Sequence, residues 1–243
     1  MIRFEQFRDV TLLHMGNGDT LVISCDSIGG IGEKKEDRVQ APPEVVGYYG
    51  ARVALMEVIA LRAKPLALIN TLSVEMKNYG ERILKGIEQG VSELPEDVIM
   101  PVTGSSEENF PMVQTALGIT VIGVLEKGTT LPPKTNGTES LYLVGLPKVG
   151  AQVLEDEGEI LSMEDLYRLR NHRNVVDILP IGSKGIAYEL KVLGHGGDKV
   201  DPEEHREIDF YQSGGPSTSA LVLMEDEGIQ ELKSIIKAPI TKL

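Results

Sequence analysis

The acids of this chain that are best placed to do chemistry are Asp9, Asp26 and Glu57. Asp9 stands at the start of a predicted strand and Asp26 directly follows another, while Glu57 lies inside an otherwise apolar, helix-like segment. A carboxylate in such a segment is costly to bury unless a cation, a metal or hydrogen-bond donors hold it. Carboxylates at strand ends are typical of magnesium sites that phosphates complete. Alternatively, Asp9 and Asp26 cap turns and Glu57 pairs with Arg52 or Arg62, and the spacing alone leaves both interpretations open.

A glycine-rich segment, Gly29–Lys34, is interpreted either as a flexible loop or as a loop that contacts phosphates. It is not a dinucleotide-binding fingerprint, because no GxGxxG joins a strand directly to a helix. A Walker-type phosphate loop is absent as well. Gly145 and Gly150 have its spacing, but Ala151 and Gln152 follow where lysine and serine or threonine are required.

Other patterns of catalytic or metal-binding residues are weaker. There is no GxSxG nucleophile elbow, and Cys25 has no evident histidine partner. Asp198, Asp201 and His205 are of metal-ligating types. A solvated polar loop is the preferred interpretation of their segment.

The composition restricts the class of protein. The 243 residues suffice for one large domain or two modest ones. A net charge of -13 argues against a general binder of nucleic acid or anionic membrane, because both need a basic surface. One cysteine excludes an intramolecular disulfide and a four-cysteine zinc site. The N-terminus does not resemble a signal peptide, and no apolar run reaches the roughly 18 to 20 residues that span a bilayer, so we expect a cytoplasmic protein.

Strands and helices mix along the chain, which indicates an α/β or α+β fold. Asn17-Gly18 between two short apolar runs predicts a β-hairpin. Pro42-Pro43 marks the start of a long helix that ends near Lys64. A domain boundary is expected near residues 146–150. Further strands are predicted at Leu66–Met76, Val98–Thr103, Leu117–Leu125, Leu141–Gly145, Asn174–Ile181 and Ala220–Met224, and further helices at Asn78–Leu94, Ser162–Arg170, Ser183–Leu193 and Glu227–Lys237.

In order along the chain, RDVTLL, LVISCD and GYYGARVALMEVIALRAKP resemble the GDDAAV, LVVTTD and GRKALAVNLSDLAAMGARP segments of thiamine-phosphate kinases. The chain therefore resembles the PurM-like superfamily, which also contains aminoimidazole ribonucleotide (AIR) synthetase, selenophosphate synthetase and the hydrogenase-maturation dehydratase. Glu57 precedes Pro65 by the same eight residues that separate the helical aspartate and proline of that family. The resemblance implies that Asp9, Asp26 and Glu57 hold Mg²⁺ on the phosphates of ATP.

Three further segments carry the resemblance. TGSSEEN followed by LGITVIGV resembles GGDT followed by ISVTVIG, GGIGEK resembles the GVGTK loop of AIR synthetases, and SGGPSTSALVLM resembles their GPGTSLLI segment. Two of these segments imply contacts to the nucleotide. Those contacts are Gly30, Gly32 and Lys34 in GGIGEK, and Glu107, Glu108 and Asn109 in GSSEEN.

The family motif DISDGL is IGSKGI here, so both aspartates are missing and Lys184 stands at the second position. Ser183, Lys184 and Gly185 precede a predicted helix. They either meet phosphate or substrate there, or Ser183 simply caps the helix. We expect the catalytic residues to be Asp26, Lys34 and Lys184.

The resemblance implies a two-domain, PurM-like α+β fold. Residues 1–147 are expected to form an ATP- and Mg²⁺-binding, dimer-forming domain with a half-barrel sheet flanked by helices, and residues 148–243 a shortened α/β AIR synthase-like domain. The implied protein is a homodimeric, ATP- and Mg²⁺-dependent small-molecule kinase with no nucleic-acid or membrane partner. Its length, RDVT opening and GSSEEN loop favour the α-ribazole kinases, which phosphorylate the lower-ligand nucleoside of cobamides. Alternatives are thiamine-phosphate kinase, another ATP-using member of the superfamily, and a non-catalytic nucleotide-binding regulatory protein.

Overall fold

The computed structural model describes residues 2–194, 197 and 200–243. They form two compact units. Unit 1 comprises the chain up to Val58 together with Arg62–Lys127, and unit 2 comprises Ile59–Leu61 and Gly128–Leu243. The units meet in the sequence at residues 127/128, upstream of the expected boundary at 147/148. Of the helices in these described stretches, none combines the length and the apolar character that crossing a membrane requires.

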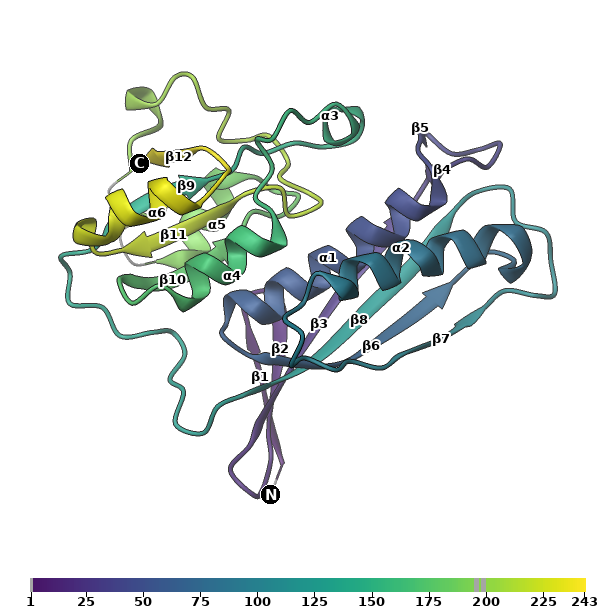
Figure 1. The fold of residues 1–243 in the computed structure, drawn as a ribbon, viewed down its shortest axis with the longest axis horizontal. Helices are drawn as coiled ribbons and strands as arrows, with labels where there is room; N and C mark the ends of the chain where they lie inside the picture. Colours follow the sequence, from purple (N-terminus) through teal and green to yellow (C-terminus); the bar gives the residue numbers. More distant parts are fainter. Residues whose placement is uncertain (1, 195–196, 198–199) are drawn as a thin grey trace. The chain divides into compact units, whose positions relative to one another are not determined.

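Unit 1 is built on a six-stranded sheet (Figure 1). Its strands are β1 (Arg3–Phe7), β2 (Val10–His14), β3 (Thr20–Gly29), β6 (Lys64–Leu72), β7 (Val102–Ser106) and β8 (Ala116–Leu125). They lie in the order β1-β2-β3-β8-β6-β7, and all neighbours are antiparallel except β6 and β7. The central pair stays in register over the whole of β3, from Thr20 opposite Leu125 to Gly29 opposite Ala116.

The predicted hairpin around Asn17-Gly18 is confirmed as the β2–β3 connection. Gly18 has a φ of 89°, in the left-handed region that glycine tolerates without strain. Strand β1 was not predicted. Its side chains are almost all exposed on both faces, so it lacks the alternating burial that marks a strand in sequence.

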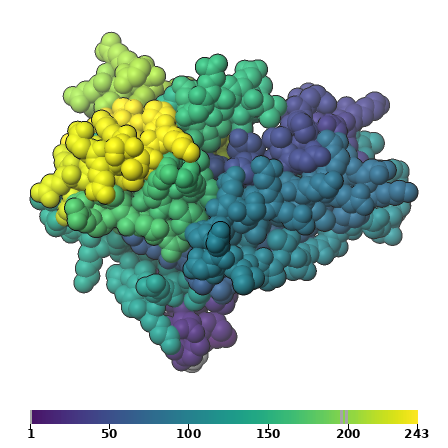
Figure 2. Space-filling model, viewed as in Figure 1, coloured from purple at the N-terminus to yellow at the C-terminus, as the bar shows by residue number. Residues whose placement is uncertain are grey.

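Two helices, α1 (Pro43–Ala60) and α2 (Glu81–Ser92), cover one face of this sheet (Figure 1). In the space-filling view, α2 (blue) forms much of the visible surface of the unit (Figure 2). The helices cross at glycines: a Cβ added to Gly47 would lie 2.0 Å from the Ile83 carbonyl oxygen. A Cβ added to Gly50 would lie 2.8 Å from Ile28 Cδ1, so α1 also lies directly on the sheet. Both helices were predicted, α1 from Pro42-Pro43 before a long apolar run and α2 because its apolar positions recur at helical spacing.

The glycine-rich segment contains two short parallel strands, β4 (Ile31–Gly32) and β5 (Val39–Gln40). A turn with π-helical hydrogen bonding, η1 (Met76–Gly80), leads into α2 and is interrupted by non-helical backbone at Lys77 and Asn78. The predicted helix from Asn78 therefore begins only at Glu81.

Unit 2 is built on a four-stranded antiparallel sheet in the order β10-β11-β9-β12. Its elements are β9 (Ser140–Val144), α3 (Ala151–Leu154), α4 (Met163–Asn171), β10 (Val175–Pro180), α5 (Ile186–Leu193), β11 (Ala220–Met224), α6 (Ile229–Ile235) and β12 (Ile240–Lys242). Every residue of β11 is buried, and Leu221 and Leu223 pack with Ile186 and Leu190 of α5. The predicted strands and longer helices are confirmed. The unpredicted α3 and β12 are too short for a periodic pattern to show.

Candidate functional site

Asp26 is a partly buried acid without a cationic partner. It lies on β3 with its side chain on the face that α1 covers, as do those of Ser24 and Ile28. Among the described residues, only the backbone N–H of Ser27 donates a hydrogen bond to its carboxylate. Burial raises the pKa of Asp26 and outweighs the lowering by the Ser27 hydrogen bond. Ser24 Oγ, two residues earlier, is buried and has no hydrogen-bond partner. Two side-chain oxygens that could bind a metal therefore lie on this face, and no positively charged group of the described residues contacts them.

Glu57 is partly buried on α1, two helical turns after Gly50 and on the same stripe of the helix. Gly50 lies over Ile28, close to Asp26, and Val58 contacts Gly123, so α1 runs along β8. At about 1.5 Å of rise per residue, Glu57 lies roughly 10 Å further along the sheet than Gly50. Asp26 and Glu57 thus share a face of the sheet but are displaced along it.

Asp9 is exposed in the turn between β1 and β2. Because Val10 lies opposite Ser24, this turn stands beside the Cys25–Asp26 portion of β3. The structure brings Asp9 and Asp26 to neighbouring strands and leaves Glu57 apart. Among the described residues, no three His, Cys, Asp or Glu side chains gather closely enough to hold a metal ion by themselves.

This arrangement still fits a magnesium ion. Mg²⁺ usually takes one or two carboxylates from a protein and completes its shell with waters and substrate phosphates. Asp26 fits this role, because its carboxylate is ionisable and partly desolvated and, among the described residues, has no cationic partner; that it binds a metal remains a prediction. Of the other two predicted ligands, Asp9 is the closer to Asp26 by strand register.

The glycine-rich segment is held in place by Asp37, a buried acid that the sequence did not single out. Its Oδ1 accepts from the Thr115 N–H at 2.8 Å, and its Oδ2 accepts from Thr115 Oγ1 at 2.7 Å and from the Lys34 N–H at 2.8 Å. Tyr79 Oη lies 2.6 Å from Thr115 Oγ1 and accepts from the Glu33 N–H. These contacts and the β4–β5 pairing occupy most of the backbone donors of the segment. A row of free N–H groups for phosphate is therefore absent from this described segment.

The two glycines that were predicted to contact nucleotide have a structural role here. A Cβ added to Gly32 would lie 2.3 Å from Thr115 Oγ1 and 2.4 Å from Tyr79 Oη, so only glycine permits this close approach. Gly30 donates its N–H to the Thr115 carbonyl at 2.8 Å. Both glycines therefore close the segment onto Thr115, and contact with nucleotide remains a prediction for them.

The ammonium group of Lys34 makes three hydrogen bonds and lies against an aromatic ring. Its Nζ donates to Glu75 Oε2 at 2.7 Å, to Glu75 Oε1 at 3.0 Å and to the Met112 carbonyl at 2.9 Å, and it lies 4.6 Å from the ring centre of Tyr79. Only 10% of the side chain is exposed. The predicted contact with phosphate would require its release from Glu75. Glu75 was not among the site residues predicted from the sequence. The signal that could have found it is the one that singled out Asp26, an acid next to an apolar, strand-like run.

Glu107, Glu108 and Asn109 follow β7 in an exposed to half-buried loop. Glu108 Oε1 accepts from the Met76 N–H at 3.0 Å, and Glu107 Oε1 accepts from the Asn109 N–H at 2.7 Å. Met76 is next to Glu75, the partner of Lys34. The structure therefore brings the two segments that were predicted to bind nucleotide together around Glu75 and Met76.

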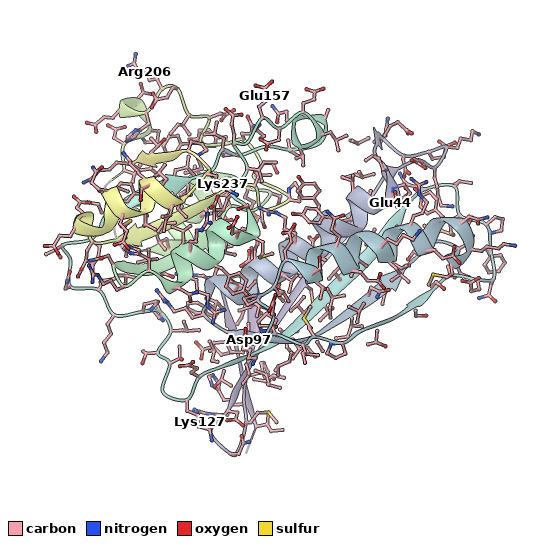
Figure 3. All side chains as sticks on the ribbon, viewed as in Figure 1. Glu44, Asp97, Lys127, Glu157, Arg206 and Lys237 are labelled. Atoms are coloured by element: carbon pink, nitrogen blue, oxygen red, sulfur yellow. The ribbon has the colours of Figure 1, made fainter. Side chains whose placement is uncertain are left out.

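Arg82 joins the glycine-rich segment to both helices. From α2 it pairs with Glu33 at 2.6 Å and with Glu44 at 2.7 Å, and Glu44 is labelled in the first turn of α1 in Figure 3. The hydrogen bond from Arg82 is the main reason why the pKa of Glu44 is lowered. This bridge fixes one end of the segment to the helical layer.

The family model for AIR synthase related protein, N-terminal domain, matches residues 7–125. This span contains Asp9, Asp26, Lys34, Glu57 and the 107–109 loop. Residues 7–125 therefore form a domain of the AIR synthase related family. Among curated proteins, none matches the sequence.

Solved structures with a similar fold include a thiamine-monophosphate kinase and a hydrogenase maturation protein. Thiamine-monophosphate kinase from Stenotrophomonas maltophilia K279a is 14% identical, with 99% of this chain and 87% of that chain covered and a TM-score of 0.56. The protein AaThiL, complexed with AMPPCP and TMP, is 14% identical over 97% and 83% of the two chains, with a TM-score of 0.60. HypE, a hydrogenase maturation protein from E. coli, is 12% identical over 91% and 78%, with a TM-score of 0.57. At these identities the likeness establishes the PurM-like α+β fold.

The motif that departs from the superfamily pattern lies in unit 2. Ser183 and Lys184 form an exposed turn, and Lys184 Nζ lies 4.1 Å from the ring centre of Tyr188. Gly185, with a φ of 75°, is the N-cap of α5, which begins at Ile186. No side chain caps this helix, so the interpretation of Ser183 as its cap is wrong. Contact of Ser183, Lys184 and Gly185 with phosphate or substrate remains a prediction.

Asp198, one member of the weaker candidate cluster, lies outside the described residues. Asp201 Oδ1 accepts from the Glu203 N–H and caps the short turn Pro202–Glu204. His205 stacks loosely on Phe210, with ring centres 6.3 Å apart. These local contacts agree with a polar loop.

Proposed function

We propose that this chain is an ATP- and Mg²⁺-dependent kinase that transfers a phosphoryl group to a hydroxyl of a small molecule. The observation that carries the proposal is Asp26, a partly buried carboxylate whose pKa burial raises and which no cation neutralises. A metal ion is the partner that such a carboxylate lacks. Further support comes from the neighbours of the same fold, which include a thiamine-monophosphate kinase and a protein complexed with AMPPCP and TMP.

In the proposed reaction, the acceptor oxygen forms a bond to the γ-phosphorus of ATP, the bond from that phosphorus to the bridging oxygen of ADP breaks, and the hydroxyl proton passes to solvent. Such transfer depends on positioning and on neutralising phosphate charge. Magnesium, when bound by Asp26 with Asp9 and Glu57 as proposed further ligands, supplies that neutralisation. Asp37 is proposed to keep the adjoining glycine-rich segment in one conformation through its hydrogen bonds with Thr115. Glu107, Glu108 and Asn109 are proposed to orient the phosphates.

We propose α-ribazole as the acceptor. The support is the sequence resemblance of the RDVT opening and the GSSEEN loop. Thiamine phosphate is the less favoured acceptor, because both aspartates of the family motif are absent at IGSKGI. A nucleotide-binding protein without catalysis is the candidate from another class, since Lys184 has opposite charge to the aspartate it replaces.

We also propose that unit 1 pairs with a second copy through the sheet face that points away from α1 and α2. This face carries apolar side chains from the two central strands, among them Ile23, Ile122 and Val124. An apolar sheet face is normally covered. Cys25 is exposed on the same face, with its Sγ 3.3 Å from Thr120 Oγ1.

The test is a direct assay. Purified protein, ATP and Mg²⁺ are supplied with α-ribazole, with thiamine phosphate or with no acceptor, ADP is measured, and the product is identified by mass spectrometry. We expect turnover with α-ribazole. Turnover with thiamine phosphate alone would overturn the acceptor, and nucleotide binding without turnover would favour the regulatory alternative. Failure to bind nucleotide at all would reject the kinase.

Variants place the activity at the proposed site. Asp26→Asn and Glu57→Gln are expected to abolish turnover while leaving the fold intact. The matched control is Asp97→Asn, an exposed acid of the same unit that is labelled in Figure 3, and it should leave activity unchanged. Full activity in Glu57→Gln would remove Glu57 from the metal site. Full activity in Asp26→Asn would remove the main support for the proposal.

A further inference from the structure

We propose that Lys34 and Glu75 form a positioning pair that clamps the glycine-rich segment to residues 107–115, which we call the strap. In this inference Lys34 acts on the nucleotide site through Glu75 and is not itself a phosphate ligand. The part that concerns nucleotide rests on the proposed function. The clamp itself does not.

The first argument is the saturation of Lys34. An ammonium group has three N–H donors and no acceptor. Glu75 takes two of these hydrogen bonds and the Met112 carbonyl takes the third, all at 3.0 Å or less. The ring of Tyr79 covers the same group. A phosphate oxygen could reach Lys34 only by displacing one of these partners from a side chain that is 10% exposed.

The second argument is what the pair connects. Lys34 belongs to the glycine-rich segment, Glu75 follows β6, and Met112 lies in the middle of the strap. These segments lie far apart in the sequence, so one side chain joins three separate parts of unit 1. Pairing with Lys34 is the main reason why the pKa of Glu75 is lowered, which keeps this carboxylate ionised.

The third argument concerns the rest of the strap. Near its beginning, Glu108 accepts from the Met76 N–H, and at its end Thr115 binds Asp37. The Val113 carbonyl accepts from the Glu36 N–H at 3.0 Å. Loss of the Lys34 side chain would therefore leave the attachments at Glu108, Val113 and Thr115 and release Met112. The predicted consequence is local loosening, not unfolding.

The test compares Lys34→Met, Glu75→Gln and the double variant. The matched control is Lys35→Met, because the Lys35 side chain is 85% exposed and, within the part of the chain that the structure describes, pairs only with the neighbouring Glu36. Hydrogen exchange of a peptide covering residues 107–115 reports the clamp, calorimetric titration with Mg²⁺ and AMPPCP reports the nucleotide site, and thermal unfolding verifies that each variant folds.

Both single changes should speed exchange in the strap and weaken AMPPCP binding by a similar factor of about tenfold, as expected when a hydrogen-bonded charge pair is broken. The double variant should be no worse than Lys34→Met, because that change already removes the bonds of Lys34 to both Glu75 and Met112. The Lys35 control should match wild type. Weaker binding in Lys34→Met with unchanged or tighter binding in Glu75→Gln would overturn the inference, because it would make Lys34 a direct phosphate contact.

The clamp and the proposed function fail differently. If the wild-type protein binds no AMPPCP, the kinase proposal fails and the exchange data alone judge the clamp. Exchange in the strap that matches wild type in both single variants would refute the clamp, whatever the nucleotide data show.

Discussion

Replacing Gly86 by alanine tests the helix crossing that fixes α1, and with it Glu57, over the sheet. A Cβ added to Gly86 would lie 1.8 Å from the Glu44 carbonyl oxygen and 2.7 Å from the Tyr48 nitrogen. Both are backbone atoms of α1, so no side-chain rotation relieves the contact. The helices must move apart by 1.6 Å before the shorter distance reaches 3.4 Å, the lower limit of ordinary contact.

Two opposing effects set the size of the change. Alanine in place of glycine inside a helix normally stabilises by about 1 kcal/mol, whereas overpacking a tight contact typically costs about 1–3 kcal/mol and sometimes more. Because the contact is with backbone, we expect the upper part of that range and a net loss of about 2 kcal/mol, which lowers the Tm by roughly 4–8 °C in a chain of this size.

Gly90→Ala is the matched control on the same helix. Its added Cβ would lie 3.3 Å from Ala51 Cβ and 3.4 Å from the Tyr48 carbonyl oxygen, so it keeps the helix-propensity gain and meets only a mild contact. Urea unfolding followed by circular dichroism should therefore rank Gly90→Ala close to or above wild type and Gly86→Ala clearly below it. Equal stabilities for the two variants would refute the tight crossing.

Two further predictions concern the site and the assembly. Burial raises the pKa of Asp26 in the folded state, so this carboxyl does not destabilise the fold below its ordinary pKa of 3.8; the destabilisation grows from there up to the folded pKa and is constant above it. Without metal, thermal unfolding should therefore show Asp26→Asn to be more stable than wild type at pH 7 and equal to it near pH 3. The reverse ranking at pH 7 would contradict the described burial. Cys25 is exposed on the sheet face that points away from α1 and α2. If two copies pair through that face, maleimide labelling of Cys25 should be fast in dilute protein and slow in concentrated protein, and a rate independent of concentration would count against that dimer face.

The elements of this fold were predictable where a periodic pattern is long. Alternating buried and partly buried residues predict β8, and the turn at Asn17-Gly18 predicts the β2–β3 hairpin. Strand β1 was not predicted, because neither of its faces is covered and its sequence therefore shows no such alternation. Asp26 was also visible in the sequence as an acid beside an apolar run, but its predicted place after the strand was wrong, because β3 continues past it to Gly29. What local pattern could not reveal is which distant residues meet. Lys34 contacts Glu75 and Met112 across 41 and 78 positions.

For the same reason the roles of the loop residues were less predictable than their positions. The GGIGEK segment was predicted to contact phosphate, but its Gly32 is required by a close approach to Thr115 and Tyr79. That requirement comes from partners contributed by the η1 turn and by the residue before β8. A sequence pattern shows that glycine is present, whereas the packing shows which neighbour makes it necessary.

The pairing of cations near the glycine-rich segment decides how a triphosphate could be neutralised. Lys34 is held by Glu75, Arg82 is held by Glu33 and Glu44, and Lys35 is exposed beside Glu36. Arg38, which is exposed beside Gly30, is the cation of this segment for which the described residues supply no ion pair. In a chain with a net charge of -13, these pairs leave Asp26 as an unneutralised acid close by. A nucleotide without metal would add negative charge to this surface, whereas Mg²⁺ would bring positive charge to both partners.

Binding of AMPPCP should therefore depend on the metal. We expect calorimetric titration to detect binding with Mg²⁺ and to lose it when EDTA removes the ion, and added Mg²⁺ in excess of EDTA should restore it. Asp26→Asn should weaken the binding of AMPPCP in Mg²⁺, and adding EDTA should weaken it little further. Asp97→Asn should behave as wild type. Tight binding of AMPPCP by the wild-type protein in EDTA would show that side chains alone neutralise the phosphates, and the assignment of Asp26 as a metal ligand would then fall.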